Sequence, residues 1–203
     1  MTILRSITTF APRTRYEPNC MERSGIKQQH LSETNQIQQH NTMNTTKKIA
    51  SALISVFDKT GLEPIVKALH QNNVTIYSTG GTQDFIEQMG IPVVAVEDLT
   101  SYPSIFGGRV KTLHPKLFGG ILFKRQSADH CNTVEKHDID AIDFVIVNLY
   151  PFVKKQKENL SHDEMIEFID IGGPSLLRAA AKNYKDVTII TDVNDYENVI
   201  EEL

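Results

Sequence analysis

The sequence predicts an α/β fold, a mostly parallel sheet with helices on both faces. Three observations support this class. Short apolar runs rich in β-branched residues, typical of buried strands, alternate with stretches that have the 3.6-residue period of amphipathic helices. The connections between these segments are short, and glycine or proline stands at several of their ends. Alternating strands and helices with short connections predict parallel strands joined by right-handed crossovers.

The first half of the ordered sequence contains three predicted strands and two predicted helices. The strands are Ile49–Val56, Val74–Ser78 and Ile91–Val96. Between the first two, apolar residues recur at the i, i+3, i+4 and i+7 positions of a helix, namely at Leu62, Ile65, Val66 and Leu69. The second helix contains Phe85, Ile86 and Met89. Gly90 closes this helix and Pro92 follows, as is common after a helix C-terminus.

The second half begins with a long loop, predicted over Glu97–Lys116. Further strands are predicted at Leu117–Phe123, Phe144–Leu149 and Val187–Thr191. Further helices are predicted at Ala128–His137, from Ser161 to about Ile169, and at Ser175–Asn183. Ser161 and Glu164 form a capping-box pattern at the start of the second of these helices. Asn194 is expected to cap a closing helix.

Residues 1–46 differ from the rest of the chain. They are rich in glutamine and asparagine and have no sustained hydrophobic period, a composition typical of disorder. Arginines among serine and threonine near the start give a faint likeness to a transit peptide. Met43 is an alternative start of translation. We therefore expect a disordered or non-native extension over residues 1–46 and one domain over residues 47–203.

Composition limits the functional classes. The 203 residues are 40% hydrophobic and carry a formal charge of −4, which suits one globular domain. The acidic balance argues against a nucleic-acid partner, because such proteins usually present a basic surface. The two cysteines predict no disulfide framework, so a reducing compartment is the simple interpretation. No apolar run approaches the roughly 18 residues of a membrane span. We therefore expect a cytoplasmic protein with no membrane partner.

The stretch Gly107–Pro115 (GGRVKTLHP) combines glycines with closely spaced cations. Glycine lets backbone approach a ligand, and arginine and lysine bind phosphate. In open parallel sheets, ligands bind outside the carboxyl ends of the strands. The segments expected on that rim are Lys59, Thr79–Thr82, Arg109–Thr112 and Asn148–Tyr150.

Two of these turns lead into helix starts, where free N–H groups and the helix dipole favour an anion. Thr60 and Ser78 add hydroxyl donors beside them. Together with the cationic stretch, the two turns predict a phosphate site.

A second glycine-rich helix start is the run Asp170-Ile171-Gly172-Gly173. Its backbone N–H groups can form an oxyanion hole. Lys182 is twelve residues from Asp170, too far for a pair on one helix, so the two would meet only if the chain folds back around the helix start. By pattern alone, a capping aspartate and a solvated lysine are the favoured interpretation. By pattern Tyr150, followed by proline, is a strand-end aromatic, and local loop packing explains His114 as well as catalysis does.

Motifs for metals and common cofactors are absent from the sequence. The seven histidines are dispersed, without an HExxH run or the paired-cysteine spacing of zinc sites. The sequence has no G-x-G-x-x-G run, no Walker lysine motif and no G-x-S-x-G elbow. We therefore expect no metal and no cofactor.

Six motifs, in matching order and spacing, give the sequence a family resemblance. They are SVFDKTG (Ser55–Gly61), STGGT (Ser78–Thr82), GGRVKTLHP (Gly107–Pro115), NLYPF (Asn148–Phe152), IDIGG (Ile169–Gly173) and LLRAAAKN (Leu176–Asn183). The region from Lys47 to Leu203 resembles the inosine monophosphate cyclohydrolase domain of the PurH family. The last four motifs together are specific, whereas STGGT alone is not. The resemblance implies a methylglyoxal-synthase-like α/β fold and a homodimer.

The resemblance also implies a reaction and residues for it. The reaction is the ring closure of 5-formamidoimidazole-4-carboxamide ribonucleotide to inosine monophosphate with loss of water, which needs no cofactor. By the family pattern, Lys111 would stabilise an oxyanion, while Tyr150, Asp170 and Lys182 would handle protons. The residues implied to hold this purine nucleotide are Ser55, Lys59, Thr79, Gly80, Gly81, Thr82, Arg109, Thr112, Asn148, Ile171 and Gly172.

The sequence departs from the family pattern in three ways. Relatives often have serine at the position of Phe57, so one hydroxyl of the phosphate loop is missing here. Residues 1–46 have no counterpart. The folate-dependent transformylase domain that follows in the family is absent, so formyl transfer is not expected of this chain.

Three other interpretations stay open. A non-catalytic regulatory module of the same fold would bind a phospho-metabolite at the same turns without needing Tyr150, Asp170 or Lys182. Phosphate elimination of the methylglyoxal-synthase type would need carboxylates beside those turns, where Asp58 is the obvious candidate. A folded fragment whose pocket is completed by a partner subunit would be idle alone.

Overall fold

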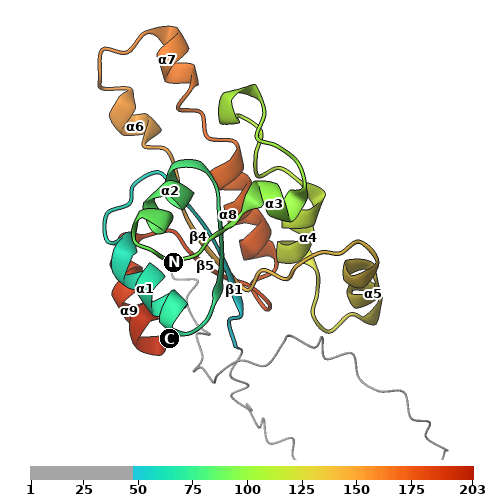
Figure 1. The fold of residues 1–203 in the computed structure, drawn as a ribbon. Helices are drawn as coiled ribbons and strands as arrows, with labels where there is room; N and C mark the ends of the chain where they lie inside the picture. The colour runs from blue at the N-terminus through green and yellow to red at the C-terminus, as the bar shows by residue number, and fades with distance from the viewer. Residues whose placement is uncertain (1–47) are drawn as a thin grey trace, which may run out of the picture.

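A five-stranded parallel sheet forms the centre of the protein (Figure 1). The computed structural model describes residues 48–203, so the expectation for residues 1–46 lies outside the described residues. In spatial order the strands are β3 (Val94–Ala95), β2 (Thr75–Ser78), β1 (Ser51–Val56), β4 (Phe144–Asn148) and β5 (Thr188–Ile190). Every pairing between these neighbours is parallel, which confirms the predicted α/β class.

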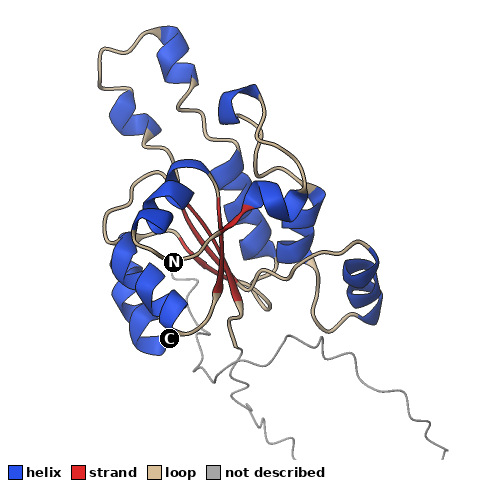
Figure 2. Ribbon diagram, viewed as in Figure 1, coloured by secondary structure: helices blue, strands red, loops and turns tan. Residues whose placement is uncertain are grey.

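Helices cover both faces of the sheet, as Figure 2 shows. One face carries α1 (Leu62–Gln71), α2 (Gly80–Gln88) and α9 (Tyr196–Glu202). The other carries α3 (Val96–Thr100), α4 (Pro115–Leu122) and α8 (Gly172–Lys182). The remaining described helices are α5 (Ala128–Lys136), α6 (Phe152–Lys155), α7 (His162–Ile166) and the short 3₁₀ helices η1 (Phe106–Gly108) and η2 (Val193–Asp195).

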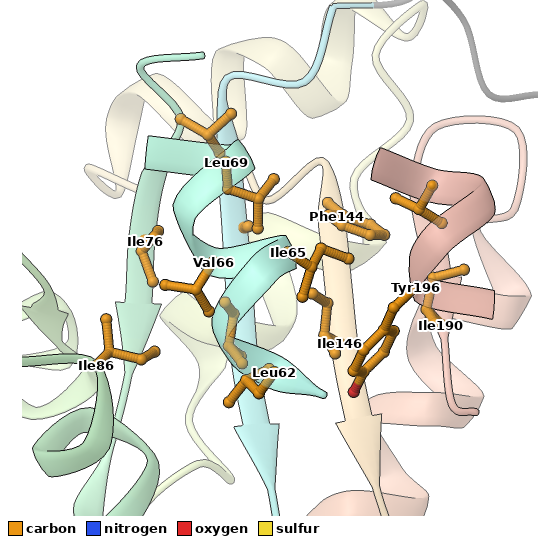
Figure 3. Packing of buried hydrophobic residues seen from close by; sticks show 14 of the residues in the cluster. Leu62, Ile65, Val66, Leu69, Ile76, Ile86, Phe144, Ile146, Ile190 and Tyr196 are labelled. Atoms are coloured by element: carbon orange, nitrogen blue, oxygen red, sulfur yellow. The ribbon is translucent and has the colours of Figure 1, made fainter. Parts of the chain in front are cut away.

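The apolar stripe of α1 packs as its periodicity predicts. Leu62, Ile65, Val66 and Leu69 have no exposed surface, and Figure 3 shows them packed among side chains of the sheet and of α9. Burial of one aliphatic side chain of this size contributes about 1.5–3 kcal/mol. The stripe therefore fixes α1 on the sheet and holds the turn that joins α1 to β1.

The segment predicted as a strand at Leu117–Phe123 is instead the helix α4. Its start is set by Pro115 in the first turn, where the missing N–H costs little, and by His114, whose Nδ1 accepts a hydrogen bond from the Lys116 N–H. A short apolar run fits a buried helix as well as a buried strand. A Cβ at Gly120 would collide with the carbonyl oxygen of Asp140, so glycine permits close packing here.

Other predicted boundaries also differ from the structure. The third strand is only Val94–Ala95, and the expected loop 97–116 contains most of α3, all of η1 and the start of α4. The capping box of Ser161 and Glu164 is confirmed, although its helix ends at Ile166. Asn194 caps no helix; the Asp192 carboxylate accepts a hydrogen bond from the Asn194 N–H at the start of η2.

At the amino ends of the strands, a buried polar cluster joins several segments. Arg125 and Asp143 form an ion pair of 3.4 Å, with side chains 9% and 2% exposed. Asp143 also accepts a hydrogen bond from the Ala50 N–H at 3.0 Å, and Arg125 donates to the carbonyl oxygens of Gly120, Phe123 and Ile142. These bonds tie the starts of β1 and β4 to the end of α4.

Residues 149–171, which we call the arm, project from the body and carry α6 and α7 (Figure 1). None of these residues is buried, and Phe152, Val153, Ile166 and Ile169 are all at least 40% exposed. The arm is therefore held by few contacts, although it borders the site described below. Within residues 48–203, no helix has the length and apolar character needed to cross a membrane.

Candidate functional site

A cavity of about 470 Å³ opens at the carboxyl ends of β1, β2 and β4. Its walls come from the turns after these strands, the segment 107–112, the start of α8 and the end of α7. The structure thus brings together on one rim the turns that the sequence predicts there. Of the predicted site residues, those that line the cavity are Ser55, Lys59, Thr79, Gly81, Thr82, Arg109, Lys111, Thr112, Asn148, Tyr150, Asp170, Ile171 and Gly172.

Two lysine ammonium groups flank the start of α2. A Cβ placed on Gly80 would lie 3.1 Å from Lys111 Nζ, and one placed on Gly81 would lie 3.9 Å from Lys59 Nζ. Gly80, which borders the cavity without lining it, has φ of +55°, a backbone conformation that glycine adopts readily. The first turn of α2 has no acidic residue and no side-chain cap. Free N–H groups and two cations therefore converge at one point, which suits a phosphate.

Several hydroxyls near this point are already used within the protein. The Thr82 hydroxyl donates to the Val56 carbonyl at 2.9 Å and accepts from the Val56 N–H at 3.2 Å. The Thr79 hydroxyl donates to Glu97, and the Ser78 hydroxyl donates to the Ile54 carbonyl. These side chains brace the ends of β1 and β2. Their hydroxyl protons are therefore already donated to acceptors within the protein.

The turn after β1 is fixed by a side chain from β4. Asn148 Oδ1 accepts hydrogen bonds from the N–H groups of Phe57 and Asp58 at 2.6 and 3.1 Å, and its Nδ2 donates to the Asp58 carbonyl at 2.7 Å. Asn148, predicted to bind substrate, therefore shapes the loop that carries Lys59. Asp58 does not line the cavity, and its carboxylate accepts hydrogen bonds from both the N–H and the hydroxyl of Thr60. These hydrogen bonds lower the pKa of Asp58.

Asp170 and Gly172 shape the start of α8 where it meets the cavity. Asp170 Oδ1 accepts a hydrogen bond from the Gly173 N–H at 2.8 Å, which confirms the capping interpretation of this residue. A Cβ on Gly172 would lie 2.7 Å from the Thr112 hydroxyl oxygen. The glycine therefore lets the helix start approach the cationic segment closely.

Tyr150 stands in a cluster of three aromatic rings. Its ring centroid lies 5.1 Å from that of Phe57 and 6.3 Å from that of Phe168, and Phe57 and Phe168 are 6.4 Å apart. Such tilted and edge-on arrangements are the favourable ones for aromatic pairs. Phe57 thus has a packing role at the position where relatives were expected to have serine, since it joins the β1 turn to the arm through Phe168.

Lys182 is the predicted site residue that the structure places elsewhere. It lies in the last turn of α8, exposed, whereas Asp170 precedes the first turn. The ten residues from Gly172 to Lys182 correspond to about 15 Å of helix. The chain does not fold back around the helix start, so the expected cluster of Tyr150, Asp170 and Lys182 is not formed within this chain.

Arg109 lines the cavity but is paired with the carboxylate of Glu167. Its guanidinium donates through both Nε and Nη2 to the two carboxylate oxygens. This interaction lowers the pKa of Glu167. Glu167 could not be identified from the sequence, since it lies two residues before the IDIGG motif and no local pattern links it to Arg109, 58 positions earlier.

Four polar groups in the cavity wall have no hydrogen bond or ion pair within residues 48–203. They are the hydroxyls of Ser55, Thr112 and Tyr150 and the ammonium of Lys111. A cation and three hydroxyls can bind a phosphate, or stabilise an oxyanion and deliver a proton. In the same part of the chain, no group of three histidine, cysteine or acidic residues could hold a metal ion. His114 caps α4 and stacks on Tyr102, which gives it a structural role.

The geometry defines a class of protein, a parallel α/β domain with a cation-lined cavity between helix starts at the carboxyl edge of its sheet. The chain belongs to the family described as MGS-like domain. The match to this family covers residues 61–175, more than half of the length of the chain. This match confirms the methylglyoxal-synthase-like fold that the motifs led us to expect.

Curated relatives carry the name bifunctional purine biosynthesis protein PurH. The protein from Clostridium botulinum (strain Langeland) is 53% identical over 155 residues, and that from Clostridium acetobutylicum is 52% identical over the same length. Each alignment covers 76% of this chain and 31% of the relative, so the chain spans about a third of the length of these relatives. A solved structure described as the crystal structure of ForH has a TM-score of 0.66 and 32% identity, over 74% of this chain and 76% of that one.

Proposed function

We propose that this chain is an inosine monophosphate cyclohydrolase. In the reaction, the carboxamide nitrogen of 5-formamidoimidazole-4-carboxamide ribonucleotide bonds to the formyl carbon and loses one proton, the formamido nitrogen loses another, and the formyl oxygen leaves as water. The observation that carries the proposal is the cavity in which the lysines at the start of α2 meet Tyr150 and Asp170. The similarity to PurH proteins supports this choice of substrate.

The ribose phosphate is proposed to bind at the start of α2. Lys59 and the backbone N–H groups of Gly80 and Gly81 would contact its oxygens, because they already converge there. The unpartnered hydroxyls of Ser55 and Thr112 would complete the shell. This arrangement supplies charge and donors without a metal ion.

The two reacting groups belong to one molecule, so orientation is the first contribution of the site. Fixing both substituents of the imidazole between the β4 turn and the start of α8 would give a large effective molarity. Lys111, on its flexible four-carbon stem, would stabilise the developing oxyanion. The Tyr150 hydroxyl would give a proton to the leaving oxygen, and Asp170 Oδ2, which Gly173 does not use, would accept one from the amide. Lys182 is given no role within one chain.

A turnover assay tests the proposal. The purified chain is mixed with the formylated ribonucleotide without metal or folate, and inosine monophosphate is followed by absorbance. We expect enzyme-dependent turnover that Lys111→Ala lowers by about 10²–10³-fold, the usual cost of losing an oxyanion stabiliser. Lys116→Ala is the matched control, since Lys116 pairs with Asp138 and does not line the cavity. Near-normal turnover of Lys111→Ala would remove Lys111 from the mechanism.

A second candidate function is a non-catalytic module that binds a phospho-metabolite. The position of Lys182 favours it, because only three of the four predicted catalytic residues meet in the cavity. Tight binding of inosine monophosphate without any turnover would select this alternative. Phosphate elimination through Asp58 is disfavoured, since the Asp58 carboxylate is held by Thr60 and does not line the cavity.

A further inference from the structure

The ion pair of Arg109 and Glu167 joins two segments that border the cavity. Arg109 lies on the hairpin 105–110, which is closed by the paired backbones of Ile105 and Val110. Glu167 follows α7 in the arm, and both residues line the cavity. Among the residues that the structure describes, no other ion pair connects the hairpin to the arm.

The pair of Arg109 and Glu167 is one part of a set of charges that line the cavity. The lining cations are Lys59, Arg109 and Lys111, and the lining carboxylates are Glu167 and Asp170. One oxygen of Asp170 caps α8. Within residues 48–203, the carboxylate of Glu167 has hydrogen bonds from Arg109 alone, so it occupies the planar donor fork that a phosphate would also use.

We propose that Glu167 is an internal competitor for the substrate anion, which holds Arg109 while the site is empty and yields it to the phosphate. The inference rests on the proposed function, because it requires an anion at this rim. The exchange is feasible because the two side chains are 63% and 57% exposed, and an exposed ion pair is weak. A phosphate carries more charge than the carboxylate, and Lys59 and the start of α2 attract it as well.

The competition predicts a specific effect on affinity. Glu167→Gln keeps the size of the side chain but removes the charge that holds Arg109. We expect inorganic phosphate to bind this variant about two- to five-fold more tightly than it binds the wild type, the range given by the usual strength of an exposed pair. Isothermal titration calorimetry at low ionic strength measures the change.

A matched control separates competition from a general change of charge. Glu63 forms an ion pair of the same exposed kind with Lys67 on α1, and neither residue lines the cavity. Glu63→Gln is therefore expected to bind phosphate as the wild type does. Equal tightening in both variants would overturn the proposal, because net charge alone would then explain it.

A double-mutant cycle tests whether the effect passes through Arg109. In an Arg109→Gln background, Glu167→Gln should no longer tighten phosphate binding, since there is no guanidinium to release. The same gain in that background would overturn the proposal in favour of simple repulsion between Glu167 and the anion. Weaker or unchanged binding in the single Glu167→Gln variant would also overturn it.

The failure of the proposed function looks different from the failure of this inference. If the wild type binds neither inorganic phosphate nor inosine monophosphate, the protein has no anion site here, and both the proposed function and the role of Glu167 are wrong. If the wild type binds phosphate and the Glu167 variant is not tighter, only the role of Glu167 falls.

Discussion

The two ends of the sheet use arginine and carboxylate in opposite ways. At the amino ends of the strands, Arg125 and Asp143 are buried against backbone groups that directly precede β1 and β4 and against a carbonyl of α4. At the carboxyl ends, Arg109 and Glu167 meet in solvent beside a cavity. Removing one partner of a buried pair leaves an uncompensated charge, whereas an exposed partner can change places with a ligand. The ion pair at the amino edge therefore stabilises the fold, whereas the ion pair at the carboxyl edge can be replaced by contacts with a ligand.

The largest effect is expected from breaking the buried pair. Asp143→Asn should lower the free energy of unfolding by about 3–5 kcal/mol, because the Arg125 charge stays buried without its partner. Urea denaturation measures the loss. Asp138→Asn is the control, since the Asp138 side chain is 96% exposed in its pair with Lys116. A stability of Asp143→Asn close to that of this control would refute the contrast between the two edges.

A smaller effect is expected from adding one methyl group at each edge. Gly120→Ala should destabilise by about 1–3 kcal/mol, because its Cβ would meet the Asp140 carbonyl oxygen in a packed interior. Gly81→Ala has room, with Lys59 Nζ at 3.9 Å, and should leave the fold intact while weakening phosphate binding at the start of α2. Thermal unfolding and phosphate titration of both variants test this. If Gly81→Ala lost as much stability as Gly120→Ala, this prediction would be wrong.

The aromatic tie between the body and the arm is expected to matter less for stability. Phe57→Ala removes the ring that contacts both Tyr150 and Phe168, and should cost about 0.5–1.5 kcal/mol for each aromatic pair lost. Trypsin should also cleave faster at the arm lysines 154, 155 and 157. Phe106→Ala serves as the control, because Phe106 is 75% exposed and has no ring partner among the described residues. An unchanged cleavage rate in Phe57→Ala would show that other contacts hold the arm.

The smallest effect concerns protonation of the exposed pair. Arg109 lowers the pKa of Glu167 below its ordinary value of 4.5, so the contribution of the pair is present above that value. It is lost as the pH falls through the lowered pKa of the folded state. Arg109→Gln should return the Glu167 pKa toward 4.5 in a carboxyl NMR titration. Glu164, whose pKa is lowered by hydrogen bonds from Ser161, should not change.

The sequence predicts most of the body because its signals are local. The stripe of α1 and the apolar runs of β1 and β4 are set by spacing alone, and they are found where they were expected. The apolar run 117–123 has no such period. Its helical state is decided by Pro115, by the cap of His114 and by close packing at Gly120, and this packing depends on the tertiary structure.

The site was predictable only where it follows from the ends of strands. Parallel topology brings the β1, β2 and β4 turns to one rim, so the residues on them could be named in advance. What each side chain does there depends on partners distant in sequence. Asn148 braces the Phe57 turn, Thr79 donates to Glu97, and Arg109 pairs with Glu167. Lys182, which the resemblance implied to be catalytic, lies in the last turn of α8 and does not line the cavity.

The sheet has very short outer strands, and this limits how copies of the chain can associate. β3 offers two residues and β5 three, while the strands between them are longer. An incoming strand would find few free backbone groups to pair with, which protects against edge-to-edge growth into fibrils. Any specific assembly must therefore rely on side-chain surfaces, and the exposed apolar residues of the arm are the most prominent of these in residues 48–203.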